Sequence, residues 1–254
     1  MTVLVDIGNT RIKWATLANG RLVRHGSAVH RDALDESVAK LAAELPPRPR
    51  IIASNVAGEP LAGRLAALVA TRPGATLELV ATSAERFGVR CGYAEPSRLG
   101  IDRWIAVLAA YHAARGAACA IDAGTAVTFD AVDASGAHLG GLILPSARLI
   151  AATLDRNTSN IGRTGAAPTV ARGLDLLGRN TDAAVGHAAW LALAAALDRA
   201  VATVARALGT PPVVYLTGGD AEALRDWLES RVELRADLVL EGLMLFAGAR
   251  AEQS

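Results

Sequence analysis

The sequence is poor in aromatic residues and carries almost no excess of charge of either sign. Aromatic residues make up 4% of the chain, and the formal net charge at pH 7 is +1. The sequence contains no basic segment interleaved with aromatic residues, so its composition gives no electrostatic reason to expect binding to nucleic acid or to an anionic membrane. We expect neither as a partner.

Cysteine is also scarce, and no hydrophobic run is long. Cys91 and Cys119 form no CxxC pair, which argues against disulfides and a zinc site and favours a reducing compartment. The N-terminus lacks the basic region, long apolar core and cleavage site of a signal peptide. The best candidate for a membrane span, residues 183–197, is too short and contains His187. We therefore expect a cytoplasmic protein.

Two common nucleotide-binding motifs are missing. There is no GxxxxGK[ST] segment and no strand-bounded GxGxxG, so P-loop kinases and dinucleotide enzymes are excluded as motif matches. With 52% apolar and 20% charged residues, the composition is that of a soluble globular protein. A length of 254 residues favours two lobes over one compact core.

The N-terminal segment predicts a hairpin with a polar turn. The apolar run 3–5 is typical of a buried strand, residues 6–10 (Asp-Ile-Gly-Asn-Thr) interrupt it, and an alternating pattern then continues through residue 16. A later segment, residues 120–129, partly repeats this pattern, with an apolar strand, Asp-x-Gly, Thr and an alternating strand. The repetition suggests two related lobes that face a shared nucleotide.

The residues of the first turn suit a phosphate site. Gly8 lets the backbone approach a ligand closely, and Asn9 and Thr10 can direct amide, hydroxyl and N–H groups toward phosphate oxygens. Asp6 is placed to hold Mg²⁺ through water, because Mg²⁺ prefers oxygen ligands and keeps much of its hydration. Lys13 can supply a compensating charge. A plain hairpin turn with an aspartate cap is the alternative.

The rest of the pattern predicts an α/β protein with a first lobe over residues 1–115 and a second over 116–254. The expected strands cover residues 21–28, 51–54, 76–81, 137–144 and 213–217. The expected helices cover residues 32–45, 61–69, 101–114, 148–155, 182–208 and 238–249, the last one amphipathic, with another starting at residue 221. The helix over 182–208 is rich in alanine on several faces, which predicts burial, in the core for most of its surface or at a subunit interface.

A loop-to-helix junction between the lobes carries a second candidate site. Pro96 and Gly100 define a loop, and Asp102 and Arg103 fall in the first turn of the following helix. An acidic residue is favoured there by the helix dipole alone, but a cation is disfavoured unless it binds an anion. An Asp beside an Arg suits a site that deprotonates a hydroxyl while it holds an anionic group. A solvated ion pair is the alternative.

These segments together resemble the type III pantothenate kinases, a family of the actin-like ATPase and sugar-kinase superfamily. The family motifs Asp-x-Gly-Asn-Thr…Lys, Pro-x-x-Leu-Gly-x-Asp-Arg and Asp-Ala-Gly-Thr-Ala…Thr are matched at residues 6–13, 96–103 and 122–128. Gly-Gly-x-Ile-x-Pro follows at 140–145 and Gly-x-Asn-Thr at 178–181. One departure is Ser146, where the family usually has glycine.

The resemblance implies a fold of two related lobes of mixed sheet flanked by helices, ribonuclease H-like, with the nucleotide in the cleft between them. It implies ATP-dependent phosphorylation of pantothenate, the first step of coenzyme A biosynthesis, with Asp102 as the catalytic base. It also implies Mg²⁺ with ATP, a monovalent cation (K⁺ or NH₄⁺) held by Asp122, and a homodimer in which Thr181 reaches the pantothenate of the neighbouring subunit.

Further binding residues follow from the same resemblance. The implied ATP-binding residues are Asp6, Ile7, Gly8, Asn9, Thr10, Arg11, Ile12, Lys13, Thr125, Gly218 and Gly219. The implied pantothenate-binding residues are Tyr93, Gly100, Ile101, Asp102, Arg103 and Thr181. For the Gly218-Gly219 pair, a simple strand–turn–helix connection is the alternative to contact with adenosine.

Two other functions remain open. One is another small-molecule kinase of the superfamily, such as a sugar kinase, against which the segment 93–103 argues. The other is a non-catalytic regulator that binds ATP, although the sequence shows no helix-turn-helix signal or basic face.

Overall fold

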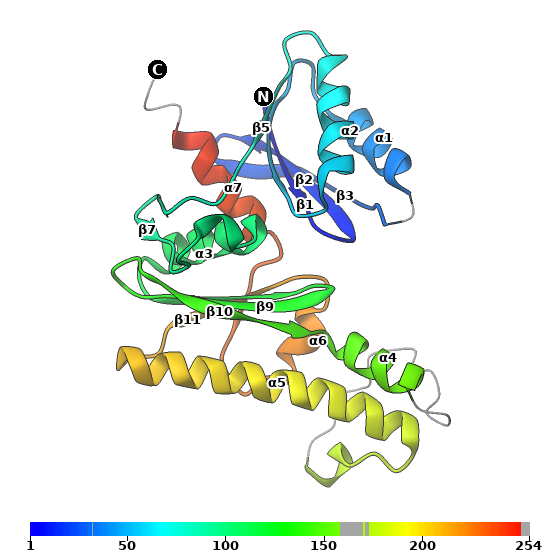
Figure 1. Ribbon diagram of the computed structural model, residues 1–254, viewed down its shortest axis with the longest axis vertical. Helices are drawn as coiled ribbons and strands as arrows, with labels where there is room; N and C mark the ends of the chain where they lie inside the picture. Colours follow the sequence, from blue (N-terminus) through cyan, green and yellow to red (C-terminus); the bar gives the residue numbers. More distant parts are fainter. Residues whose placement is uncertain (32, 158–169, 171–172, 250–254) are drawn as a thin grey trace. The chain divides into compact units, whose positions relative to one another are not determined.

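The structure, a computed structural model, describes residues 1–31, 33–157, 170 and 173–249 (Figure 1). The chain forms two compact units: Met1–Ala113 with Asp237–Ser254, and Ala114–Ala236. Each unit is built on one five-stranded mixed sheet with helices packed on it. The expected fold class, α/β with two related lobes of mixed sheet, is confirmed.

The first unit is organised around β1, whose apolar residues are buried on both faces of the sheet. The strand order is β3-β2-β1-β4-β5, and β1 is antiparallel to β2 and parallel to β4. Val3, Leu4 and Val5 are all buried, because a strand covered on both faces needs a continuous apolar run. The strands are β1 (Thr2–Ile7), β2 (Arg11–Ala18), β3 (Arg21–Val29), β4 (Arg50–Asn55) and β5 (Thr76–Leu79).

Helices cover the core of this unit. Leu41 of α1 and Leu61 and Leu65 of α2 pack with Val3 and Val5 in one apolar cluster. The helices are α1 (Leu34–Glu44), α2 (Glu59–Ala70), α3 (Ile101–Ala114) and α7 (Leu238–Ala249). A small hairpin of β6 (Glu85–Arg86) and β7 (Val89–Arg90) and a 3₁₀ turn, η1 (Pro96–Arg98), precede α3.

The second unit has the same strand order, β10-β9-β8-β11-β12. Its central strand, β8, is antiparallel to β9 and parallel to β11, as β1 is to β2 and β4. Its strands are β8 (Ala118–Ala123), β9 (Ala126–Val132), β10 (His138–Pro145), β11 (Val213–Thr217) and β12 (Glu233–Leu234). Its helical elements are α4 (Ala147–Asn157), η2 (Gly173–Leu176), α5 (Thr181–Leu208) and α6 (Ala221–Arg225). The partial repeat in the sequence therefore reflects a repeated sheet topology.

Helix α5 buries one face only. Figure 1 shows it running along the sheet of the second unit, and Val185, Ala189, Trp190, Leu193 and Leu197 enter the core cluster with residues of β8 and β9. The opposite side, with residues 184, 188, 191, 192 and 195, is exposed. The buried positions of α5 recur at helical spacing and form a single stripe along the helix. The expectation that most of the helix surface lies in the core is therefore wrong.

Helix α5 is longer than the segment 183–197 that the sequence offered as the best candidate for a membrane span. At 28 residues, it is the one helix in the described part of the chain that is long and apolar enough, by length and composition alone, to cross a membrane. The argument from residues 183–197 being too short therefore does not apply to the whole helix. Its buried stripe nevertheless belongs to the core of the second unit.

Helix α7 packs within the first unit, although it closes the chain. It contacts β1, β2 and β4, whereas the division expected from the sequence counted residues 238–249 with the second lobe. The helix also packs closely against α3, since a Cβ added to Gly242 would lie 2.5 Å from the carbonyl oxygen of Ile105. The helix is also more apolar than amphipathic, with Leu238, Val239 and Leu243 all buried.

Most expected elements are present within a few residues of their predicted bounds. The elements that the sequence did not indicate are η1, η2, the β6–β7 hairpin and β12. Strands of two residues are too short to show an alternating pattern.

The Gly242 contact generates a test of how α7 packs. Gly242→Ala should lower the free energy of unfolding by about 1–3 kcal/mol, the usual cost of overpacking. Gly248→Ala is the control on the same helix, because a Cβ there meets nothing within 4 Å. It should leave stability unchanged or raise it by up to about 1 kcal/mol through helix propensity. Equal unfolding midpoints in urea for the two variants would contradict this packing.

Candidate active site

The first candidate site is the turn between β1 and β2. Asp6 is half-buried at the end of β1 and lies directly opposite Lys13 across the antiparallel pair. The hydroxyl of Ser54, the parallel neighbour of Asp6 on β4, donates a hydrogen bond to Asp6 Oδ1 at 2.8 Å. A carboxylate oriented in this way at the end of a buried strand suits the predicted magnesium role, because Mg²⁺ in nucleotide sites takes few protein carboxylates and keeps bound water.

The turn itself is closed by backbone and side-chain hydrogen bonds. The Gly8 N–H donates to the Arg11 carbonyl at 3.1 Å. His30 Nε2 lies 2.7 Å from the Gly8 carbonyl oxygen, and the His30 N–H donates to the Thr10 carbonyl at 3.0 Å. Sequence reasoning assigned no role to His30. The only signal available was its position shortly after the strand expected over residues 21–28.

The second candidate site is the equivalent turn in the second unit. Asp122 is half-buried at the end of β8, and Thr125 is exposed in the turn that leads to β9. Thr128 lies opposite Asp122, at the place that Lys13 occupies opposite Asp6. Thr217 on β11 is the parallel neighbour of Asp122, as Ser54 is of Asp6. The two turns therefore share their framework and differ in charge.

The Gly218-Gly219 segment packs against this second turn. Gly218 has φ +100°, and a Cβ there would lie 2.5 Å from both the carbonyl carbon of Ala123 and Oδ1 of Asp122. The Asp220 N–H donates to the Ala123 carbonyl at 3.0 Å. Only glycine fits at residue 218, whether or not a base stacks there. The structure thus places Gly218 next to Asp122.

The start of α4 is tied to the same segment. Arg148 binds Asp220 through two hydrogen bonds, Nη2 to Oδ1 at 2.7 Å and Nε to Oδ2 at 3.2 Å. Ser146, at the position where the resembled family usually has glycine, accepts the Leu149 N–H at 3.3 Å. This departure from the motif therefore supplies a helix N-cap.

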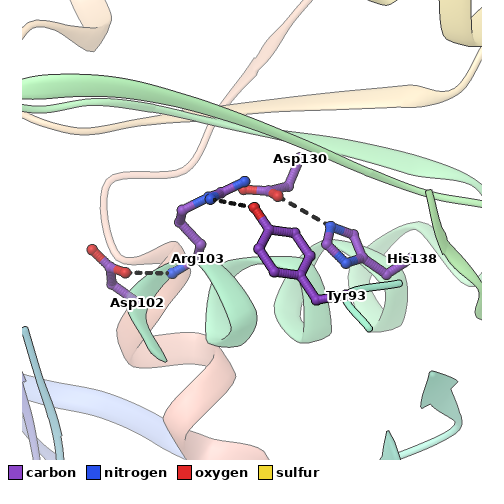
Figure 2. A network of polar contacts seen from close by, with 5 residues as sticks. All are labelled: Tyr93, Asp102, Arg103, Asp130 and His138. Carbon is purple, nitrogen blue, oxygen red and sulfur yellow. Dashed lines mark hydrogen bonds and ion pairs between the residues drawn. The ribbon is translucent and has the colours of Figure 1, made fainter. Parts of the chain in front are cut away.

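The third candidate site is the beginning of α3 (Figure 2). The side chain of Arg103 is 6% exposed, and its Nη1 donates to the Tyr93 hydroxyl at 3.0 Å. Its guanidinium carbon lies 5.8 Å from the centre of the Tyr93 ring. Because Arg103 is buried, the alternative of a solvated ion pair at the surface does not describe it.

Asp102 is oriented by the backbone next to it. Its Oδ1 accepts the Arg103 N–H at 2.8 Å (Figure 2). A Cβ on Gly100 would lie 2.8 Å from the same oxygen. Gly100 therefore provides the space into which the carboxylate folds. Ile101 is buried at the first position of the helix. The structure brings together Tyr93, Gly100, Asp102 and Arg103.

A buried polar pair lies in the second unit. His138 Nε2 and Asp130 Oδ1 are 3.1 Å apart, with side chains at most 2% exposed, where the pairing of β9 and β10 shifts register (Figure 2). Burial, with a smaller effect of the Asp130 charge, raises the pKa of the Cys119 thiol to about 12. Cys119 is therefore an inert core residue. Sequence reasoning missed the pair, which has no spacing signal.

Thr181 is the first residue of α5 and is exposed. Asn180 caps the helix, accepting the Ala183 N–H on its side-chain oxygen at 2.8 Å. The Thr181 hydroxyl thus lies at a well-defined helix start.

These positions can be compared with known proteins. A model of the type III pantothenate kinase family matches residues 2–203. The chain belongs to the type III pantothenate kinase family. The matched range contains both aspartate turns, the start of α3 and Thr181, while Gly218 and Gly219 lie beyond it.

Curated family members are similar along nearly the whole chain. A type III pantothenate kinase of Nitrosococcus oceani is 34% identical over 249 residues, covering 96% of this chain and 92% of that protein. One from Pseudomonas aeruginosa (strain LESB58) is 37% identical over 247 residues, covering 96% and 98%.

Solved structures support the fold. A Baf family protein from Campylobacter jejuni superposes with a TM-score of 0.59 at 18% identity, covering 98% of this chain and 99% of that chain. The ethanolamine utilization protein EutJ from Carboxydothermus hydrogenoformans gives 0.53 at 16% identity, covering 96% and 89%. At these identities, the likeness concerns the fold alone.

Proposed function

We infer that this chain transfers a phosphoryl group from ATP to pantothenate, the first step of coenzyme A biosynthesis. The observation that carries this inference is the family match over residues 2–203, which includes both aspartate turns, the start of α3 and Thr181. The oriented Asp102 and the buried Arg103 at the start of α3 supply the groups that such a reaction needs.

Asp102 acts as the general base. Pantothenate presents a primary hydroxyl, whose proton passes to the Asp102 carboxylate as the oxygen attacks the terminal phosphorus and ADP leaves. The hydrogen bond from the Arg103 N–H restrains this carboxylate, and a positioned base is what proton transfer requires. The other end of pantothenate is a carboxylate, for which Arg103 is the matching cation, held in place by Tyr93. Gly100 and Ile101 shape the same pocket.

The nucleotide binds through the two aspartate turns. Residues 6–13 and Thr125 contact its phosphates, and Gly218 and Gly219 lie against adenosine. Asp6 would hold Mg²⁺ through water, supported by its orientation by Ser54. When bound, this ion neutralises charge that develops on the transferring phosphoryl group.

Asp122 would hold a monovalent cation, K⁺ or NH₄⁺. The support is the difference between the two turns, since the position opposite the aspartate is Lys13 in the first and Thr128 in the second. A bound cation would supply the positive charge that the second turn does not carry at that position.

The active unit is a homodimer. The support is the exposed apolar face of α5, on which Leu191 is 43% exposed beside several alanines. Two-fold pairing is the commonest way to cover such a face. Thr181, at the start of this helix, would bind the pantothenate of the neighbouring subunit. Both cysteines are free thiols, which supports a cytoplasmic location.

The role of Asp102 is tested by Asp102→Asn. This variant should keep the fold and its affinity for ATP but lower kcat by about two to four decades, the usual effect of losing a general base. Asp35→Asn is the matched control, because Asp35 is likewise the second residue of a helix and forms an exposed pair with Arg64. A kcat for Asp102→Asn within a few-fold of wild type would eliminate Asp102 as the base.

The cation site is tested by changing the salt. With Mg²⁺ present throughout, rates in K⁺ or NH₄⁺ should clearly exceed rates in Na⁺ alone, because Na⁺ is the smaller ion and a poorer match for a site suited to K⁺ or NH₄⁺. Asp122→Asn should reduce this dependence. Equal rates in sodium-only and potassium buffers would contradict the proposed site for K⁺ or NH₄⁺ at Asp122.

The shared site is tested by Thr181→Ala, which should raise the KM for pantothenate by about one to two decades, as expected for one lost buried hydrogen bond. The KM for ATP should stay nearly unchanged. Mixing inactive Asp102→Asn with inactive Thr181→Arg should restore activity, because a mixed dimer unites one intact Asp102 with one intact Thr181. A fully active monomer in sedimentation, or no recovery despite subunit exchange, would refute the arrangement.

A further inference from the structure

We propose that His30 is a positioning residue, which holds the turn of the first hairpin in the conformation that receives nucleotide phosphates. The inference deepens the proposed function and rests on the assignment of this turn to the nucleotide. It concerns Gly8, Asn9, Thr10 and His30, all within the first unit.

His30 binds both sides of the turn. Its ring Nε2 is 2.7 Å from the Gly8 carbonyl oxygen, and its backbone N–H donates to the Thr10 carbonyl at 3.0 Å. A carbonyl oxygen can only accept, so the ring carries its proton on Nε2 and donates. At 7% exposure, His30 is shielded from the water that would otherwise compete for these carbonyls.

The ring contact fixes the direction of a phosphate-binding group. The Gly8–Asn9 peptide bond is trans, and in a trans peptide the carbonyl and the following N–H point in opposite directions within one plane. Since the Gly8 carbonyl points at His30, the Asn9 N–H points away from the ring. Asn9 is exposed as a residue, and we place this N–H on the open side of the turn, where an anion can accept it.

His30 is itself held by a rigid element. Its carbonyl accepts the Ala33 N–H at 3.2 Å, and the Ser37 hydroxyl in α1 donates to the Val29 carbonyl at 2.8 Å. The turn is thus connected through His30 to the beginning of α1. Phosphate-binding groups supported in this way need little reorganisation when the nucleotide binds.

The test compares His30→Ala with His30→Gln. Alanine removes the ring donor and should raise the KM for ATP about three- to tenfold, the range for one neutral hydrogen bond, with the KM for pantothenate within twofold of wild type. Glutamine carries an N–H donor at similar reach and should recover most of the loss. The Kd of a non-hydrolysable ATP analogue with Mg²⁺, measured by calorimetry, should change in the same order.

His112→Ala is the matched control. His112 Nε2 also lies close to a turn carbonyl, that of Phe87 at 2.9 Å, but in the β6–β7 hairpin. Its removal should leave the affinity for the ATP analogue at the wild-type value. If His30→Ala does not fold, His30→Asn serves instead, because its amide is too short to reach Gly8.

Three results would overturn the inference: unchanged affinity for the analogue in His30→Ala, an equal rise of KM for both substrates, or no recovery with glutamine. A wild-type chain that binds the analogue but does not phosphorylate pantothenate would refute the proposed function alone. The His30 inference would then still be decided by calorimetry.

Discussion

Each unit depends on one buried central strand that is hydrogen-bonded on both sides and has an aspartate as its next-to-last residue. β1 pairs with β2 and β4, and β8 pairs with β9 and β11. Burial on both faces requires apolar residues along the strand. The aspartate of each central strand lies near the strand's end, where Asp6 and Asp122 are half-buried beside the turns. The architecture thereby positions the charged groups.

The two units differ in the residues that surround their aspartates. A hydroxyl residue lies beside each aspartate, Ser54 in one unit and Thr217 in the other, but Ser54 donates to Asp6 whereas Thr217 donates to the Ala236 carbonyl at 3.3 Å. With Lys13 opposite Asp6 and Thr128 opposite Asp122, the same framework provides two sites of different charge. This difference in charge is what supports the proposal of a hydrated divalent ion at the first turn and a monovalent ion at the second.

The sequence could predict those parts of the fold that local pattern determines. The buried strands, the turn at residues 6–10 and the helix that begins at Ile101 follow from apolar periodicity and turn residues. It could not predict that α7 packs in the first unit, because the order of elements along the chain does not show that the chain goes back to the first unit after the second. It also could not show that α5 buries a single stripe, since alanine is compatible with either a buried or an exposed face.

The site was predictable only in part for a similar reason. Motif residues such as Asp6 and Gly8 could be identified, but the residues that hold them in place act through contacts distant in sequence. Ser54 reaches Asp6 across 48 positions and His30 reaches Gly8 across 22. Neither contact leaves a spacing signal.

The most direct test of the account is to identify the product. The purified full chain would be incubated with Mg²⁺, ATP and K⁺, and with pantothenate, a panel of sugars or no acceptor, and the phosphorylated product would be identified by ³¹P NMR and mass spectrometry. The account predicts 4′-phosphopantothenate formed one for one with ADP, and no sugar phosphate. Nucleotide binding without phosphorylated pantothenate in either K⁺ or NH₄⁺, or transfer to a sugar instead, would contradict it.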